Sequence, residues 1–169
     1  MLGLKIIIYA FIFLTSSAIG VLISKKYDQR VNELIEIKNA LNMFKTKIKF
    51  TYEPIPEIFK EISETLNTRT GKVFEIASSN MKLLAAGEAW NMAIDTNILD
   101  INEEDKKVLK ELSKLLGRTD VEGQVNQIEL TSSFLNGQIK KAEKDKEKNE
   151  KMYRVLGMII GLAIVIILM

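Results

Sequence analysis

The sequence predicts an all-α protein: a cytosolic antiparallel helical bundle flanked by N-terminal and C-terminal transmembrane helices. Residues 6–23 contain no charged side chain, and neither do residues 155–169. Between these runs, apolar residues recur at three- and four-residue steps with hardly any strand-like alternation, which is typical of amphipathic helices. We therefore divide the chain into a first span (1–23), a soluble bundle domain (24–153) and a second span (154–169).

Both uncharged runs have the length of membrane helices. Residues 6–23 cover roughly 27 Å at ~1.5 Å per residue, close to the ~30 Å hydrocarbon core of a bilayer. From Val155 the second run covers about 22 Å, and Arg154 can bend its head back to the interface. Residues 16–18 also resemble a signal-peptide cleavage site, which would export the domain. The apolar run continues past that site, which favours an uncleaved span.

Basic residues on the inner flanks of the two runs indicate the orientation. Such residues tend to remain in the cytoplasm, and the outer flanks carry only Lys5. We therefore expect the bundle in the cytosol and both termini on the far side of the membrane. The inner-flank residues are Lys25, Lys26, Arg30 and Lys38 after the first run, and Lys140, Lys141, Lys144, Lys146, Lys148, Lys151 and Arg154 at the second.

The composition excludes several classes of function. The chain has 24 basic and 22 acidic residues, and this balance argues against nucleic acid as a partner. It has neither Cys nor His, so disulfides, thiol nucleophiles, ordinary zinc sites and His-based catalysis are absent. We found no nucleophile with a base and no phosphate-binding glycine loop. The sequence thus predicts no cofactor, no metal and no catalytic residues.

Helix breaks in the middle of the chain can be placed from local signals. We expect the first helix to end near Thr51, because Pro54 and Pro56 lack the backbone donor that a helix needs, and Pro56 suits the first turn of the next helix. Residues 67–71 (NTRTG) separate a third segment, and Gly87 marks a weak boundary.

Two further helices follow that boundary. The first carries Trp90, which we read as a core residue. The second begins at Asn102, which with Asp105 three residues later is typical of an N-terminal cap. We expect this helix to stop at Gly117. We expect the last helix to start at about Thr119 and to run without a break into the second span.

An acidic cluster lies at the start of the helix that Asn102 opens. Its carboxylates could be oxygen ligands for a divalent cation. Carboxylates at a helix start also meet free N–H groups and the positive end of the helix dipole, which explains the cluster without a metal. The cluster comprises Asp100, Glu103, Glu104 and Asp105.

Small residues recur four apart in both predicted spans. Gly157 and Gly161 form a GxxxG pair, and Ser16 and Gly20 repeat that spacing in the first span. A helix face without bulky side chains allows another helix to approach closely. The pattern fits packing of the two spans against each other, a contact between two copies of the chain in a homo-oligomer, or chance.

Four stretches, in this order and spacing, resemble the stage III sporulation protein AB family of endospore-forming bacteria. The resemblance covers essentially the whole chain, and the tail with the Pro-x-Pro element is its most specific part. Members commonly have T-P-L-P where this chain has Glu53-Pro54-Ile55-Pro56, and they have Ser where this chain has Thr119. In both places the side chains are similar in shape. The stretches are TYEPIPEIFKEIS, GEAW, LGRTD and EKMYRVLGMIIGLAIVIIL.

The resemblance implies a membrane component of the complex built between mother cell and forespore, in the mother-cell membrane that faces the forespore. This family is similar to the inner-membrane platform proteins of type II secretion and type IV pilus machines. By that analogy the partners are a cytosolic secretion-type ATPase, other membrane components of the sporulation complex, and membrane lipid. Two alternatives remain open: a membrane-anchored regulatory sensor, and an exported structural scaffold.

Candidate partner-contact residues lie in two places. Glu53, Pro54 and Pro56 form a rigid loop on a helical scaffold, which suits a docking surface. Gly87 and Glu88 resemble a Gly-Glu element of the platform family. All five are also explained as helix breaks and caps.

Overall fold

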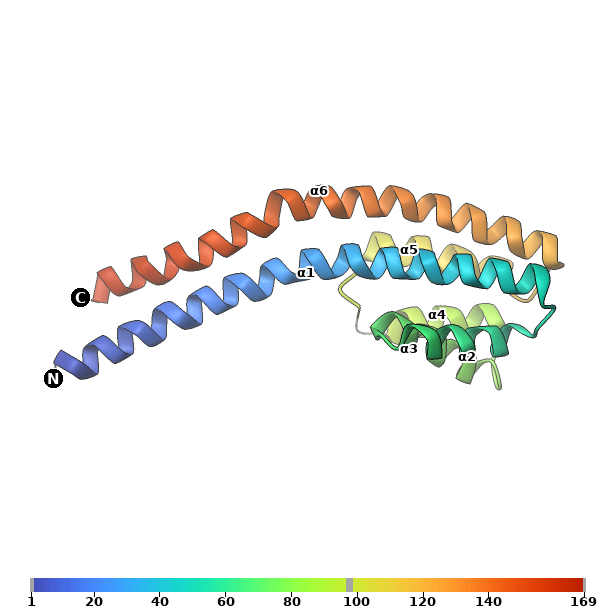
Figure 1. Cartoon of the computed structure of the whole chain (residues 1–169), viewed down its shortest axis with the longest axis horizontal. Helices are drawn as coiled ribbons and strands as arrows, with labels where there is room; N and C mark the ends of the chain where they lie inside the picture. Colours follow the sequence, from blue (N-terminus) through green and yellow to red (C-terminus); the bar gives the residue numbers. More distant parts are fainter. Residues whose placement is uncertain (1, 97–98, 169) are drawn as a thin grey trace. The chain divides into compact units, whose positions relative to one another are not determined.

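The computed structural model describes residues 2–96 and 99–168, and all regular secondary structure in these residues is helical. The all-α prediction is confirmed, and the two terminal helices are long and apolar enough to cross a membrane. Figure 1 labels the helices. They are α1 (Leu2–Phe50), α2 (Ile55–Leu66), α3 (Arg69–Asn80), α4 (Ala86–Thr96), α5 (Glu103–Lys110), the 3-10 helix η1 (Glu111–Lys114) and α6 (Val121–Leu168).

The chain forms two compact units. Unit 1 contains Met1–Val31 and Lys141–Met169, and unit 2 contains Asn32–Lys140. The predicted boundaries at residues 23 and 154 mark where charged residues begin. Unit 1 extends further along both helices because α1 and α6 stay paired there beyond the uncharged runs, through ion pairs between Arg30 and Asp145 and between Asp28 and Lys146.

The proline signals at the end of α1 gave correct boundaries. Helix α1 ends at Phe50, and Pro56 lies in the first turn of α2. Asn67 ends α2 in the left-handed conformation with φ 41°, and the Thr68 hydroxyl caps α3 by accepting from the Gly71 N–H at 3.3 Å. These local signals work because each changes the backbone conformation of its own residue or its neighbour.

The boundary predicted at Gly87 lies one residue from the start of α4, but the helix before it ends earlier, and the helix end predicted at Gly117 is wrong. Helix α3 already ends at Asn80, whose carbonyl accepts from the N–H groups of Leu83 and Leu84. This turn is closed by backbone groups alone, so it leaves no Gly or Pro signal. The helix expected to reach Gly117 ends at Lys110 and continues as one 3-10 turn. Gly117, with φ 73°, forms the following turn instead.

An aromatic cluster holds unit 2 together. Phe59 on α2 lies 5.0 Å from Phe44 on α1, 5.1 Å from Phe74 on α3 and 5.7 Å from Trp90 on α4, measured between ring centroids. All four rings are fully buried, and the inclined ring planes match the geometry that aromatic pairs prefer. Trp90 Nε1 donates to the Leu109 carbonyl at 2.8 Å, which ties α5 to the cluster.

An ion network around the buried carboxylate of Glu33 lies between α1, the start of α3 and the segment before α5. The Arg69 guanidinium is 2.5 Å from the Glu33 carboxylate and 2.8 Å from that of Asp100. The Asp100 backbone N–H also donates to Glu33 at 2.6 Å, and the Thr68 hydroxyl donates to Glu36 at 3.0 Å. Burial raises the pKa of Glu33 above its ordinary value of 4.5, although the Asp100 N–H and Arg69 act in the opposite direction.

We expect Phe59→Ala to lower the free energy of unfolding by about 3–5 kcal/mol, since the truncation leaves a cavity among three rings. Trp90 is the only tryptophan of the chain, so its fluorescence during urea unfolding reports on this cluster. Phe50→Ala is the matched control: Phe50 is 69% exposed, and we expect a change within about 0.5 kcal/mol. Equal losses in the two variants would contradict this role of the cluster.

The raised pKa of Glu33 predicts a pH dependence of stability. Because the folded chain holds this proton more tightly than the unfolded chain, the contribution to stability is fully present below 4.5 and is lost as pH rises through the folded pKa. Relative to Glu33→Gln, the wild type should therefore lose stability as the pH rises above 4.5 toward neutral. Urea titrations of both proteins across this range measure the difference, and a difference independent of pH would refute the assignment.

Candidate functional site

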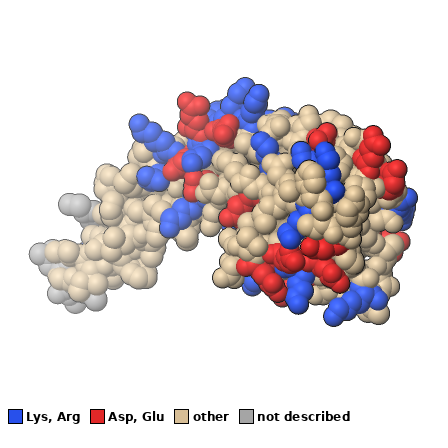
Figure 2. Space-filling model, turned by 45° about the vertical axis from the view of Figure 1, so that its right-hand side comes forward, with Lys and Arg blue, Asp and Glu red and all other residues tan. Residues whose placement is uncertain are grey.

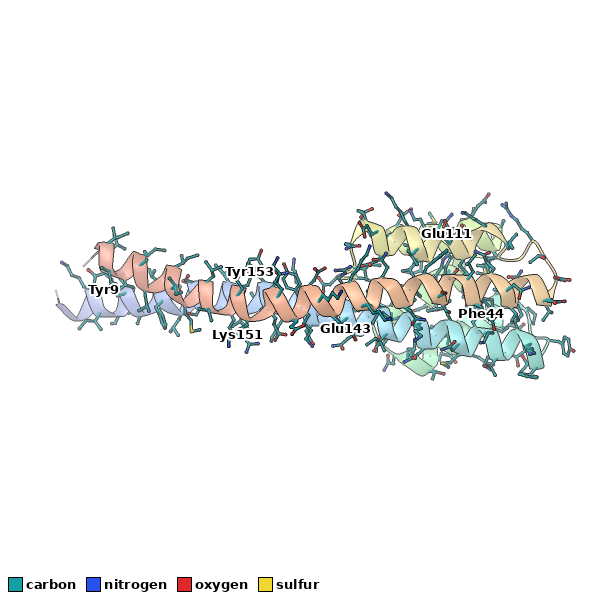
Figure 3. The ribbon with its side chains drawn as sticks, turned by 90° about the horizontal axis from the view of Figure 1, so that it is seen from above. Tyr9, Phe44, Glu111, Glu143, Lys151 and Tyr153 are labelled. Atoms are coloured by element: carbon teal, nitrogen blue, oxygen red, sulfur yellow. The ribbon has the colours of Figure 1, made fainter. Side chains whose placement is uncertain are left out.

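The four small residues singled out in the sequence meet where α1 and α6 pack in unit 1. The two helices run antiparallel side by side (Figures 1 and 3). A Cβ atom built on Gly20 would lie 2.7 Å from the Tyr153 carbonyl oxygen and 2.9 Å from the Gly157 Cα. The Ser16 hydroxyl donates to the Gly157 carbonyl at 2.8 Å, and a Cβ on Gly161 would lie 3.1 Å from the Ser16 Cβ. The backbones therefore touch, and side chains at Gly20 or Gly157 would push them apart.

Aromatic and charged contacts continue this pairing beyond the uncharged runs. Tyr27 and Tyr153 stack with centroids 5.8 Å apart and planes inclined by 17°. Arg30 pairs with Asp145 at 2.8 Å. Lys146 pairs with Asp28 on α1 at 2.5 Å, and this hydrogen bond raises the pKa of Lys146. The cross-helix pairs fix the register of α1 against α6.

The outer surface of unit 1 is apolar where the sequence lacks charge. In the 18-residue apolar windows of α1 and α6, only 6% and 11% of residues are buried. On the face drawn in Figure 2, the described ends of both helices show no charged atoms. Large unburied apolar surfaces of this kind are typical of segments that contact lipid or another protein.

The predicted contact loop of unit 2 is partly held in place by its own chain. Pro54 is exposed, while the Pro56 carbonyl accepts from the Ser78 hydroxyl at 2.8 Å. The Glu53 carboxylate lies 3.8 Å from the Lys47 ammonium, which also pairs with Glu61. This loop is thus rigid at Glu53 and Pro56 and open at Pro54.

The other two predicted contact residues, Gly87 and Glu88, differ in burial. Gly87 is buried in α4, and a Cβ on it would overlap the Ser113 carbonyl oxygen. Glycine is therefore needed for the close approach of η1 to α4. Glu88 next to it is exposed.

Sequence reasoning missed a group of exposed apolar residues, here called the apolar end, at three turns of unit 2. A Cβ on Gly117 would lie 3.0 Å from Ala86 and 3.9 Å from Ile55, so the turns before α2, before α4 and before α6 adjoin. Leu83 is 91% exposed, and Tyr52 is 81% exposed with φ 57°. The available signal was the presence of bulky apolar residues inside turns. The apolar end comprises Phe50, Tyr52, Leu83, Leu84, Leu115 and Val121.

The acidic cluster before α5 is accounted for by helix capping and ion pairs. Asn102 and Asp105 form a capping box with backbone-to-side-chain distances of 2.8 and 3.0 Å. Glu103 pairs with Lys106 at 2.7 Å, and Asp100 with Arg69. Among the residues that the structure describes, no group of three or more acidic side chains is arranged to hold a metal ion.

Comparison with known proteins gives the family. The family model for stage III sporulation protein AB matches residues 5–169. The chain belongs to this family. A relative from Bacillus subtilis (strain 168), stage III sporulation protein AB, is 25% identical over 170 residues, which cover 98% of this chain and 99% of the relative. A solved structure of stage III sporulation protein AB (SpoIIIAB) has a TM-score of 0.64 and 21% identity, covering 71% of this chain and 98% of its own.

Membership confirms the resemblance noted in the sequence and places the chain among stage III sporulation proteins. The solved relative shows that the helical fold recurs within the family. Beyond the family, the structure describes two features: the close α1–α6 pair in unit 1 and the apolar end of unit 2.

We expect Gly157→Ala to destabilise the α1–α6 pair by about 1–3 kcal/mol, because the added methyl group overlaps the Gly20 Cα and the Ser16 carbonyl. Hydrogen exchange of the α1 and α6 amides, measured on the full chain in detergent, should accelerate in unit 1. Gly137→Ala in the same helix is the matched control. Its new Cβ meets nothing within 4 Å, so it should leave exchange unchanged or slow it. Equal exchange in both variants would disprove the close contact.

Proposed function

We propose that the chain is a non-enzymatic, membrane-anchored platform of the mother cell–forespore complex, and that it couples a cytosolic secretion-type ATPase to membrane partners. Unit 1 serves as the anchor and unit 2 lies in the cytosol of the mother cell. Family membership supports a role in sporulation. The coupling role is supported by the similarity of the family to secretion platform proteins and by the surfaces described above.

The observation that carries the proposal is the apolar end of unit 2. The chain enters and leaves unit 2 at Asn32 and Lys140, and the apolar end lies at the turns on the other end of α1 and α6 within that unit (Figure 1). Tyr52 and Leu83 stand almost fully in solvent. Exposed aromatic and aliphatic groups on rigid turns are the usual anchors of protein–protein contacts.

The anchor is supported by the character of unit 1. Its uncharged helices expose apolar residues on nearly every side, while their small residues face each other. In lipid, helix association relies on such close backbone packing because the hydrophobic effect does not drive it. The basic residues on the inner flank of each run favour a cytosolic position for unit 2.

Site-specific photocrosslinking tests the proposal in sporulating cells. A benzophenone amino acid at Tyr52 or Leu83 should crosslink the full chain to a cytosolic hexameric ATPase, identified by its peptides in the adduct. Glu103 is the control position, because it is exposed at the start of α5, away from the three turns. The proposed coupling would be refuted if only the Glu103 position gave adducts with an ATPase. It would also be refuted if neither Tyr52 nor Leu83 gave such an adduct in intact cells.

A further inference from the structure

The part of α6 that precedes its uncharged run is rich in charge, with an excess of basic residues. Residues 141–154 contain six basic and four acidic side chains. Lys144, Lys148 and Lys151 are spaced four and three residues apart, so they lie on one face of α6. We call these three residues the lysine face.

Ion pairs leave the lysine face unneutralised. Within unit 1, Asp145 pairs with Arg30, Asp28 with Lys146, and Glu150 with Arg154. The three residues of the lysine face are exposed, and none has an ion pair with any residue that the structure describes. Glu147 is four residues before Lys151, a spacing that permits a pair, but no pair forms.

The lysine face points away from the α1 contact. Tyr153 stacks on Tyr27 of α1, and Lys151 is two residues earlier, about 200° around the helix. Figure 3 shows these two side chains on opposite sides of α6. The three ammonium groups are therefore free to reach a ligand outside the helix pair.

The distance to the uncharged run identifies the ligand. At ~1.5 Å per residue, Lys151 and Lys148 lie about 6 and 10 Å from Val155, and Lys144 lies about 16 Å from it. The polar layer of a bilayer leaflet is roughly 5–8 Å thick, and a surface charge acts over a further Debye length of about 8–10 Å. On α1, the exposed Lys25 and Lys26 follow the first run directly and add two charges at the same depth.

We infer that the lysine face is a binding site for anionic phospholipid headgroups in the leaflet at the charged end of unit 1. The inference rests on the membrane anchor proposed above, but not on the ATPase contact. Each Lys near an anionic leaflet strengthens binding about fivefold. Phosphatidylglycerol should therefore bind this site better than phosphatidylcholine, with Lys151 and Lys148 contributing more than Lys144.

Native mass spectrometry of the detergent-solubilised full chain tests the inference. An equimolar mixture of phosphatidylglycerol and phosphatidylcholine should give adducts that favour phosphatidylglycerol at least about fivefold, the factor that ~1 kcal/mol supplies. The triple variant Lys144→Gln, Lys148→Gln, Lys151→Gln should lose this preference. The triple Lys→Arg variant at the same positions keeps the charges and should retain it.

Two controls make the result specific. The variant Lys60→Gln, Lys82→Gln, Lys107→Gln removes three exposed charges from unit 2 and should bind like the wild type, while Trp90 fluorescence verifies the fold of each protein. Equal binding of the two lipids, or an undiminished preference in the Lys144, Lys148, Lys151→Gln variant, would overturn the inference. Full displacement by millimolar glycerol phosphate would assign the site to free phosphate and would overturn it too.

Discussion

Unit 1 depends on the approach of two backbones at Gly20 and Gly157, where there is no room for a side chain. This contact sets the separation and register of α1 and α6, and the other contacts follow from it. Only at this separation can Ser16 reach the Gly157 carbonyl and Tyr27 stack on Tyr153. The ion pair between Arg30 and Asp145 belongs to the same register. A shift of one residue would break all of these contacts, so they specify one alignment together.

Unit 2 is organised around the Phe59 ring, which contacts aromatic residues from three other helices. Beside this apolar centre, the buried Glu33 carboxylate pairs with the exposed Arg69, which also pairs with the partly exposed Asp100. Such a pair adds little net stability, but an arrangement that separates Glu33 from Arg69 would leave a buried carboxylate without its partner. The aromatic cluster thus provides most of the burial, while the network favours one placement of α3 and of the segment before α5.

Local signals made much of the fold predictable from the sequence. Prolines, caps and uncharged runs act on their own residues, so the end of α1, the start of α2 and the cap at Asn102 could be placed. Contacts between distant residues left no such signal: Arg69 meets Glu33 and Asp100 across more than thirty residues on either side. Lys146 likewise pairs with Asp28, which is 118 residues away in the sequence. The sequence marked Gly87 as a boundary, whereas in the structure its missing side chain allows the Ser113 carbonyl to approach α4 closely.

The contact between Ser16 and Gly157 has a consequence for the order of synthesis. The two residues are 141 positions apart, and ribosomes add about 5–20 residues per second. Ser16 therefore exists for roughly 7–30 seconds before its acceptor is made. During that time the hydroxyl can bond only to groups already present, and a carbonyl one turn earlier in α1 is suitably placed. The first helix must be a stable solitary helix in its surroundings, and the pair forms only when almost the whole chain has left the ribosome.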